Sequence, residues 1–421
     1  DDLDKELRRQ FDVCHSCRRC FNLCDSFPKL FDLIDESDSG ELDSVESVDF
    51  KPIVDACTLC DMCFLTKCPY VPPHEFNLDF PHLMLRYRAI EFKKGEIGLT
   101  TKELTKTDRN GKLLGAVSPL ANWASDTSNS LTRGALEMTT KVHREAALPK
   151  FHKNSFVSLT EKHKPDVNED APAFGRKAVI YATCFVNYNN PDIGNSALSV
   201  LALNGVDTQV AYPSCCGMPQ LEHGNIEEVA AAAKKVAAEL KTFINEGRDI
   251  IALTPSCALM LKFEWPLIVP DDADVKALAA STYDIDEYVV DIAKKEGLTP
   301  GLKPLDGNVA LHQACHSRAQ NFGQKSAEML NFIPDLSLNV IERCSGHGGS
   351  WGMMKDNFKT AIKVGKPAAR QALKANPKYV VSGCPLAGEH ILQGIDFLGN
   401  SDKRPKSANH PIEILAKAYD L

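Results

Sequence analysis

The sequence lacks the features that mark several large classes of protein. No stretch approaches the ~18 consecutive apolar residues of a membrane span, and the richest one, residues 229–240, is mostly alanine and carries Lys234 and Lys235. The formal net charge of −8 leaves no overall basic footprint for nucleic acid. A glycine-rich dinucleotide fingerprint ahead of a helix is also missing, so we expect any flavin or nicotinamide to belong to another chain. The first ten residues are charged and do not resemble a secretory signal.

Length and composition indicate a globular protein with several domains. With 421 residues, and ~150 residues for each domain, about three domains are expected. Hydrophobic residues make up 43% and charged residues 25%, which excludes collagen-like, low-complexity and fully disordered chains. The charge is uneven, because residues 1–80 hold 18 Asp and Glu against 8 Lys and Arg. The acidic stretch over residues 25–56 is either a solvated loop, which we favour, or a docking surface for a basic partner.

Cysteine is what the sequence has in excess, with 15 residues. The chain is too long for a small disulfide-stapled secreted domain, so clustered cysteines indicate metal binding or redox chemistry. The first eight form two runs, C-x2-C-x2-C-x3-C and C-x2-C-x2-C-x4-C, as in bacterial ferredoxins with [4Fe–4S] clusters. Three thiolates at this spacing wrap one corner of a cube, and the fourth comes from the other run. The predicted ligand sets are Cys14, Cys17, Cys20 with Cys68, and Cys57, Cys60, Cys63 with Cys24.

Zinc is the main alternative for these eight cysteines. Structural zinc takes four Cys or His ligands in a tetrahedron, and two three-cysteine runs, each with a trailing cysteine, fit cubane clusters better. Two details depart from the bacterial pattern: proline follows Cys24 only at Pro28, and the last gap of the second run is one residue longer. Neither detail removes a ligand. Residues 1–110 are therefore predicted to form an α-helical, ferredoxin-like domain with two clusters.

Residues 111–176 contain no cysteine and are predicted to be a helical connector and linker. Apolar residues recur there with patchy helical periodicity, so we expect a pair of helices that pack on the ferredoxin-like part. Basic residues lie nearby, which makes contact with a membrane surface or a partner protein the alternative. The apolar positions are Leu113, Leu114, Val117, Leu120, Trp123, Leu131, Leu136 and Met138.

The rest of the chain is predicted to be α/β and to repeat one βαβαβα unit. Strands at 178–184, 209–212 and 250–254 each lead to cysteine, and the order returns with strands at 309–313, 338–341 and 379–382. The three pairs of cysteines are offset by 131, 129 and 127 residues, which predicts a duplication with pseudo-two-fold symmetry over 177–300 and 301–421. Parallel strands place their sites at their carboxyl ends, so each half is expected to gather its cysteines there.

The last seven cysteines are predicted to be metal ligands, because structural thiols would not recur at repeat positions. The first repeat offers four thiolates, enough for a further [4Fe–4S] cluster, whereas the second offers three. The two sets are Cys184, Cys215, Cys216 and Cys257, and then Cys315, Cys344 and Cys384.

Two ferredoxin-like runs followed by two Cys…Cys-Cys-Gly…Cys repeats resemble the heterodisulfide-reductase-related iron–sulfur proteins. The segments 184–189 and 215–217 resemble the iron–sulfur subunit of anaerobic glycerol-3-phosphate dehydrogenase, and the iron–sulfur subunit of glycolate oxidase shares the layout. The resemblance covers nearly the whole chain. It implies an electron-transfer subunit that works with a flavoprotein dehydrogenase or another redox partner, such as a rubrerythrin-like, peroxide-reducing iron protein.

The sequence departs from heterodisulfide reductase, in which each repeat supplies five cysteines to a non-cubane cluster. Here Met260 takes the last position of the first repeat, and Cys344-Ser345-Gly346 replaces the second Cys-Cys-Gly. With three thiolates, one iron of a cluster in the second repeat needs another ligand. An open catalytic position and an empty, degenerate site explain this equally well. The candidates for the open position, and so for a catalytic role, are His316, His347, Ser345, water or a substrate.

These observations favour two classes of function. In the first, the chain relays electrons between a redox partner and an acceptor such as a quinone or a peroxide-reducing iron protein. In the second, it is a reductase that acts on a disulfide or a peroxide at an open iron in the second repeat. A cluster-bearing scaffold would load only the first two clusters. We expect a cytoplasmic protein, peripheral to the inner face of the membrane if its contact is quinone-linked.

Overall fold

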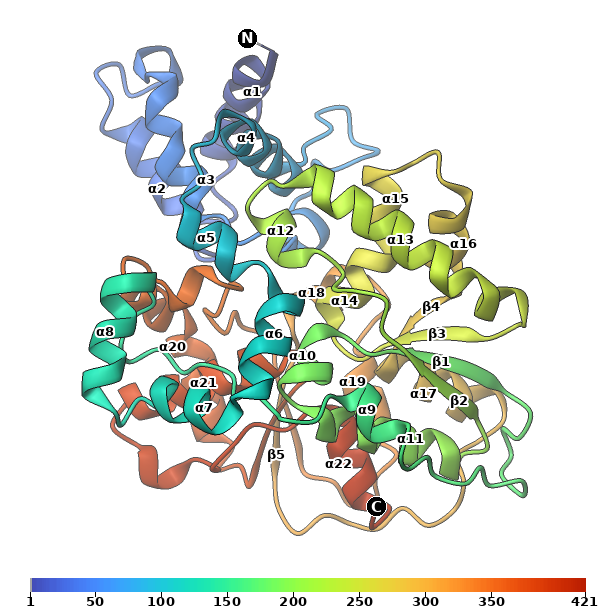
Figure 1. Ribbon diagram of the computed structural model, residues 1–421. Helices are drawn as coiled ribbons and strands as arrows, with labels where there is room; N and C mark the ends of the chain where they lie inside the picture. The colour runs from blue at the N-terminus through green and yellow to red at the C-terminus, as the bar shows by residue number, and fades with distance from the viewer. Residues whose placement is uncertain (1) are drawn as a thin grey trace.

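The N-terminal part of the computed structural model, which describes residues 2–421, is a helical bundle at one end of the molecule (Figure 1). The rings of Phe11, Phe27, Phe50 and Phe80 pack together in its core, with centroid distances from 4.7 to 5.9 Å. The cysteine runs lie where helices end. The bundle consists of α1 (Asp2–Cys17), α2 (Ser26–Asp35), α3 (Lys51–Ala56) and α4 (Phe80–Lys94), with a π-helical turn at Cys63–Lys67.

The first repeat is a parallel sheet covered by helices. Its strands β1 (Lys177–Tyr181), β2 (Asp207–Ala211), β3 (Asp249–Ala252) and β4 (Thr282–Asp284) are ordered β2-β1-β3-β4. The three predicted strands are present, and β4 is an addition that the sequence did not signal. The larger helices are α11 (Pro191–Leu203), α13 (Ile226–Asn245), α16 (Ala273–Ser281) and α17 (Ile285–Lys295); the shorter ones are α10 (Cys184–Tyr188), α12 (Met218–Glu222), α14 (Pro255–Leu259) and α15 (Trp265–Ile268).

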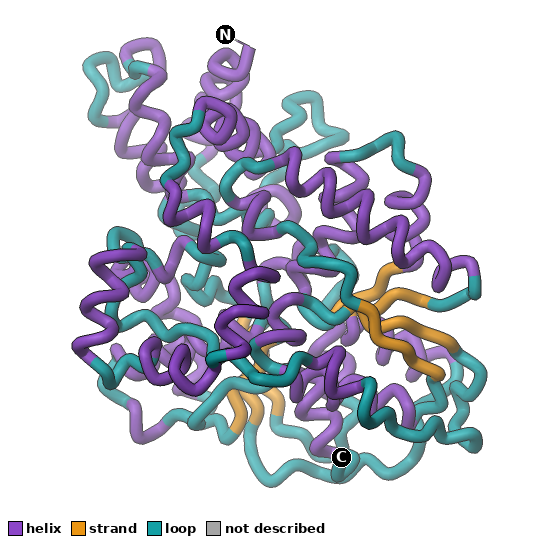
Figure 2. The backbone as a smooth tube through the Cα atoms, in the orientation of Figure 1, coloured by secondary structure: helices purple, strands orange, loops and turns teal. Residues whose placement is uncertain are grey.

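The second repeat has the same topology with one strand fewer. Its strands β5 (Val309–His312), β6 (Leu338–Ile341) and β7 (Tyr379–Ser382) are all parallel, in the order β6-β5-β7. This order matches β2-β1-β3, as a duplication requires, and Figure 2 shows the strands in two separate groups. Its helices are α18 (Cys315–Ala319), α19 (Lys325–Leu330), α20 (Phe358–Lys374), α21 (Pro385–Phe397) and α22 (Pro411–Ala418).

The connector packs mainly on the two repeats, and it meets the N-terminal bundle where Lys102 lies over the Phe92 ring of α4. Its helix α6 contacts α10 of the first repeat, and the His143 ring stacks on Phe358 of the second, with centroids 4.1 Å apart. The connector helices begin before residue 111, where the connector was predicted to start; they are α5 (Leu99–Leu104), α6 (Thr107–Ala116), α7 (Ser118–Ser125), α8 (Ser130–Thr140) and α9 (Phe156–Thr160).

The prediction that the apolar side chains of the connector pack inward is wrong. Of the eight positions, only Leu136 is partly covered, and the other seven are exposed. The helices bury small and charged residues instead, namely Gly111, Gly115, Arg133 and Glu137. The buried Arg133 guanidinium donates hydrogen bonds to the carbonyls of residues 143, 144 and 146, which turns the apolar face of α8 outward.

Two large hydrophobic clusters each span more than one part of the chain. One cluster of buried residues joins the N-terminal bundle to the first sheet, and a second joins the first sheet to the second. No helix within residues 2–421 is long and apolar enough to cross a membrane. The parts therefore hold fixed positions relative to one another, which matters for the cysteines that they carry.

Gly224 allows the first repeat to pack on α4, so Gly224→Ala should destabilise the protein. Its φ is +76°, and a Cβ there would overlap the backbone of Arg88 and Ala89. The matched control is Gly247→Ala, at φ +74° with open space around it. We expect about 1–2 kcal/mol from the left-handed backbone in both variants and about 1–3 kcal/mol more for overlap in Gly224→Ala. Equal urea midpoints for the two variants would contradict this packing.

Candidate metal centres

The first cysteine group combines Cys14, Cys17, Cys20 and Cys68, which line one small cavity in the N-terminal bundle. α1 carries Cys14 and Cys17, and a left-handed residue, Arg18 at φ 51°, turns the chain toward Cys20. The Tyr70 N–H donates to Cys68 Sγ at 3.4 Å. Burial raises the pKa of the Cys20 thiol to about 11, and the neighbouring thiols add to this.

The second group brings together Cys24, Cys57, Cys60 and Cys63. Each of the other three is near enough to Cys63 to raise its pKa further, after burial, which is the main cause. Burial also raises the pKa of Cys24 to about 12. The loop between Cys57 and Cys63 contains two left-handed residues, Leu59 at φ 47° and Asp61 at φ 57°.

The third group lies at the carboxyl edge of the first sheet, where Cys184 follows β1, Cys215 and Cys216 follow β2, and Cys257 follows β3. The sulfurs of Cys184 and Cys215 are 3.7 Å apart, and those of Cys216 and Cys257 are 3.3 Å apart. Hydrogen bonding with Cys184 and Cys216 lowers the pKa of Cys215 and raises the pKa values of these two partners.

The fourth group, Cys315, Cys344 and Cys384, occupies the equivalent edge of the second sheet. Cys344 and Cys384 both lie close enough to Cys315 to raise its pKa, in addition to the larger effect of burial. The Gly346 N–H donates to Cys344 Sγ at 3.3 Å. Cys344 is the exposed member of the group.

The structure assigns different surroundings to the three non-cysteine candidates. Both ring nitrogens of His316 have protein partners, Ser256 Oγ at 2.8 Å and Leu59 O at 3.2 Å. Ser345 Oγ accepts from the His347 N–H at 3.4 Å. His347 is buried with its Nε2 unpartnered, and its ring lies 6.0 Å from that of His390. Burial lowers the pKa of His347 to about 3, so its imidazole is neutral and able to act as a ligand.

The four groups follow one another through the molecule, an arrangement that sequence reasoning missed. Cys20 of the first group acts on Cys63 of the second. Cys60 of the second group is close to Cys315 and Cys344 of the fourth. The chain of contacts ends with Cys384 of the fourth group, which lies near Cys257 of the third. A small core of Met62, Leu259 and Ala319 fills the space beside these groups.

The thiols fit an iron–sulfur cluster in their chemistry. Three groups gather four sulfurs each, and burial raises the pKa of most of them, so that the uncompensated thiolates would be costly. A bound cation removes this cost, because coordination deprotonates a thiol outright. In the part of the chain that the structure describes, no set of three or more Cys, His, Asp and Glu side chains is arranged around a single metal ion.

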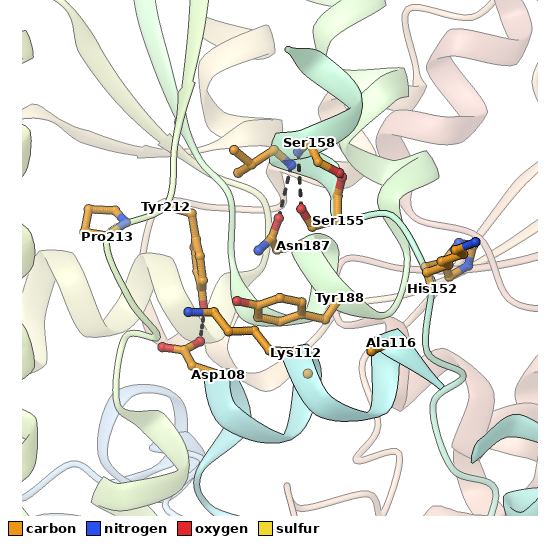
Figure 3. A pocket seen from close by; sticks show the side chains of 14 residues that line it. Asp108, Lys112, Ala116, His152, Ser155, Ser158, Asn187, Tyr188, Tyr212 and Pro213 are labelled. Carbon is orange, nitrogen blue, oxygen red and sulfur yellow. Dashed lines mark hydrogen bonds between the residues drawn. The ribbon is translucent and has the colours of Figure 1, made fainter. Parts of the chain in front are cut away.

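A cavity of about 430 Å³ lies beside the third group, between α6, α10 and the segment 152–158 (Figure 3). Asp108 joins it to the cysteines, because its carboxylate accepts hydrogen bonds from Tyr212 Oη and, at 2.9 Å, from the Cys215 N–H. Lys112 and Tyr188 reach into the space from opposite walls. Gly111 lies directly against the Tyr188 ring, so a larger residue there would push the walls apart.

The profile of the cysteine-rich (CCG) domain matches residues 178–262 and 309–388, one match in each repeat. A lactate utilization protein A from Geobacillus sp. is 30% identical over 190 residues, which span 42% of this chain and 75% of the relative. The chain belongs to the CCG-domain family of iron–sulfur proteins. The resemblance drawn from the cysteine pattern is thereby confirmed.

Two further members of the family extend the match. An anaerobic glycerol-3-phosphate dehydrogenase subunit from Escherichia coli is 26% identical over 325 residues, 75% of this chain and 76% of that protein. An uncharacterized iron–sulfur protein from Methanocaldococcus jannaschii is 27% identical over 270 residues, 62% of this chain and 51% of that protein. Relatives of this CCG-domain protein are thus iron–sulfur proteins and oxidoreductase subunits.

Asp108 should support the third group, so Asp108→Ala is expected to lower the free energy of unfolding by about 1–3 kcal/mol. The Cys215 N–H and the Tyr212 hydroxyl would lose their acceptor in a buried place. Asp108→Asn, which keeps one acceptor oxygen, should lose less. The matched control is Asp38→Ala on the exposed acidic loop, expected within about 0.5 kcal/mol of the wild type. Identical urea midpoints for Asp108→Ala and Asp38→Ala would exclude this role.

Proposed function

We propose that this CCG-domain protein relays electrons between a redox partner and an acceptor, with [4Fe–4S] clusters held by the first, second and third cysteine groups. When bound, such clusters supply one-electron redox chemistry. The proposed ligands are Cys14, Cys17, Cys20 and Cys68; Cys24, Cys57, Cys60 and Cys63; and Cys184, Cys215, Cys216 and Cys257. The three thiols of the fourth group, Cys315, Cys344 and Cys384, would hold a further cluster with one position for another ligand.

The order of the groups carries this proposal. Electrons pass readily only between carriers that lie close together. The turn that begins at Cys63 contacts α18, which begins at Cys315, and α18 contacts α14, which contains Cys257. The first group adjoins the second within the N-terminal bundle. The resulting order is first, second, fourth, third. The fourth group thus lies between the second and the third as an intermediate electron carrier. This role gives a reason for its presence although it has three cysteines and each of the other groups has four.

The first and third groups, at the two ends of this order, indicate which partners the protein has. We propose a flavoprotein dehydrogenase or a rubrerythrin-like protein as the redox partner, since the chain itself has no dinucleotide fingerprint. The cavity beside Cys184 and Cys215 is where we place a small acceptor such as a quinone, and this implies a peripheral contact with a membrane. The N-terminal group, near the acidic loop, is then the end for the protein partner.

A reductase with its own active site in the second repeat is the alternative, and the exposure of Cys344 favours it. There a disulfide or peroxide would meet an open position beside the fourth group. Of the three candidates, His347 has a free ring nitrogen, whereas both nitrogens of His316 are engaged. Ser345 would act only through its contact with the His347 backbone.

Iron and acid-labile sulfide analysis of the anaerobically purified protein tests which groups are loaded. About eight iron atoms per chain would load only the first two groups and support a scaffold, about twelve would add the third, and more would populate the fourth. We expect more than twelve, because the relay passes through the fourth group, and Cys216→Ser should lower the content by about four. Ser407→Ala, which is exposed and lies outside the cysteine groups, is the control. A count of twelve or fewer would contradict the relay in this order.

Cys60→Ser tests the order of the groups, because Cys60 lies where the second group meets the fourth. In a reductive titration followed by EPR, dithionite should still reduce the third group of the variant. Reduction of that group by a donor that reaches only the N-terminal end should become at least tenfold slower. The control is Ser407→Ala, which is exposed and lies outside the cysteine groups. Unchanged rates in Cys60→Ser, with its second cluster lost, would exclude this path.

A further inference from the structure

The connector presents an apolar surface that faces solvent, which we call the α6–α8 surface. It consists of three consecutive helices, of which α7 contacts both α6 and α8. Leu120 is 62% exposed, Trp123 59%, Leu131 83% and Met138 79%. The remaining exposed members are Leu113, Leu114 and Val117. Clustered apolar side chains of this size at a surface mark a docking site.

The helices that form this surface are inverted relative to ordinary surface helices. On α6 the buried residues are Gly111 and Gly115, while Leu113 and Leu114 face solvent. On α8 the buried residues are Arg133 and Glu137, while Leu131 and Met138, seven residues apart, share the outer face. A surface helix of a globular protein normally turns its apolar stripe to the core. In these helices the apolar stripe faces solvent, where it can contact another molecule.

The charge around the α6–α8 surface indicates what covers it. Residues 99–153 hold nine Lys and Arg against five Asp and Glu, a net of +4, whereas the rest of the chain has a net of −12. Asp108 is engaged beside Cys215, and Glu103 is paired with Lys106 and Arg109. Lys141 and Lys150, which do not line the cavity, have no ion pair within 4 Å among residues 2–421, and this leaves them available to an anionic surface.

We propose that the α6–α8 surface docks on the anionic face of a lipid bilayer. Leu, Met and Trp side chains insert at the boundary of head groups and acyl chains, and the flanking lysines contact lipid phosphates. An exposed Trp is suited to this boundary, since its ring is apolar and its N–H is polar. The acidic remainder of the protein is repelled by such a membrane, so the contact is limited to the connector and its orientation is fixed.

This inference rests on the peripheral membrane contact in the proposed function and specifies its geometry. The opposite faces of α6 serve two purposes: Gly111, Lys112 and Gly115 line the cavity beside the third cysteine group, and Leu113 and Leu114 belong to the docking surface. Because α6 lies between the two, docking brings the cavity to within the thickness of one helix of the bilayer, near the source of a lipid-soluble acceptor.

Co-sedimentation of the intact, cluster-loaded protein with vesicles tests the docking. The protein should pellet with vesicles of phosphatidylcholine mixed with phosphatidylglycerol and bind phosphatidylcholine alone at least fivefold more weakly. Leu120→Ser and Trp123→Ser should each weaken partitioning about tenfold, because each loses most of a buried apolar side chain. Leu267→Ser, which is 64% exposed on α15 outside the connector, is the matched control and should bind like the wild type.

Charge variants separate lipid binding from protein binding. Lys141→Gln and Lys150→Gln should each weaken binding to the anionic vesicles about fivefold and leave binding to neutral vesicles unchanged. Failure of the wild type to pellet with anionic vesicles overturns the proposal, as does equal binding by Trp123→Ser and the wild type. Concentration-dependent dimerisation that Leu120→Ser abolishes would assign the surface to a second copy and also overturn it. None of these readouts involves electron transfer, so the relay is tested separately.

Discussion

The buried guanidinium of Arg88 joins the N-terminal bundle, which carries the first and second cysteine groups, to the first repeat. Arg88 on α4 donates to Val54 O at 2.6 Å and to Cys57 O, both beside the second group, and to Glu222 O at 2.9 Å in the first repeat. Its residue is only 9% exposed. A buried charge is tolerated only when its hydrogen-bond donors have acceptors, so the three carbonyl groups are constrained to positions within hydrogen-bond distance of the guanidinium. Arg88 thereby fixes the N-terminal bundle on the first repeat, and the close approach of Gly224 to its backbone adds a steric requirement.

The position of the remaining groups follows from the parallel sheets. The strands of each repeat are parallel and end at one edge of its sheet, and the segments that follow all of them except β4 carry the cysteines. The helices α14 and α18, which begin beside Cys257 and at Cys315, contact each other across the two repeats. The two carboxyl edges therefore face one another, and His316 connects both to the Leu59 carbonyl of the second group. Sheet topology and one histidine thus align groups that are far apart in the sequence.

The sequence was sufficient for features that depend on local spacing. Near-equal cysteine offsets predicted the duplication, and the strand periodicity located six of the seven strands; β4, of three residues, is too short to leave a pattern. The proximity of Cys60 to Cys315 and Cys344 could not be predicted, since no sequence signal reports which loops meet. The prediction for the connector was wrong for a different reason. Periodicity shows that a helix has an apolar face, but it does not show whether that face points to the core or to solvent. There Gly111 and the carbonyl-bound Arg133 decided the orientation.

In the second repeat, where Ser345 stands in place of a cysteine, the chain continues into a glycine-rich loop at residues 346–352. Gly346 gives its N–H to Cys344, as expected for a loop that approaches a cluster, but Gly348 and Gly349 serve another purpose. At φ 57° and 62° they bring the loop against Thr58 of the second group and Glu222 of the first repeat, where side chains would collide. The conformation of both glycines is thus set by contact with these neighbours. The helix α18, which begins at Cys315, contacts both α14 and the turn at Cys63–Lys67, so the fourth group lies between the second and the third, and this is why we rank the relay above the reductase.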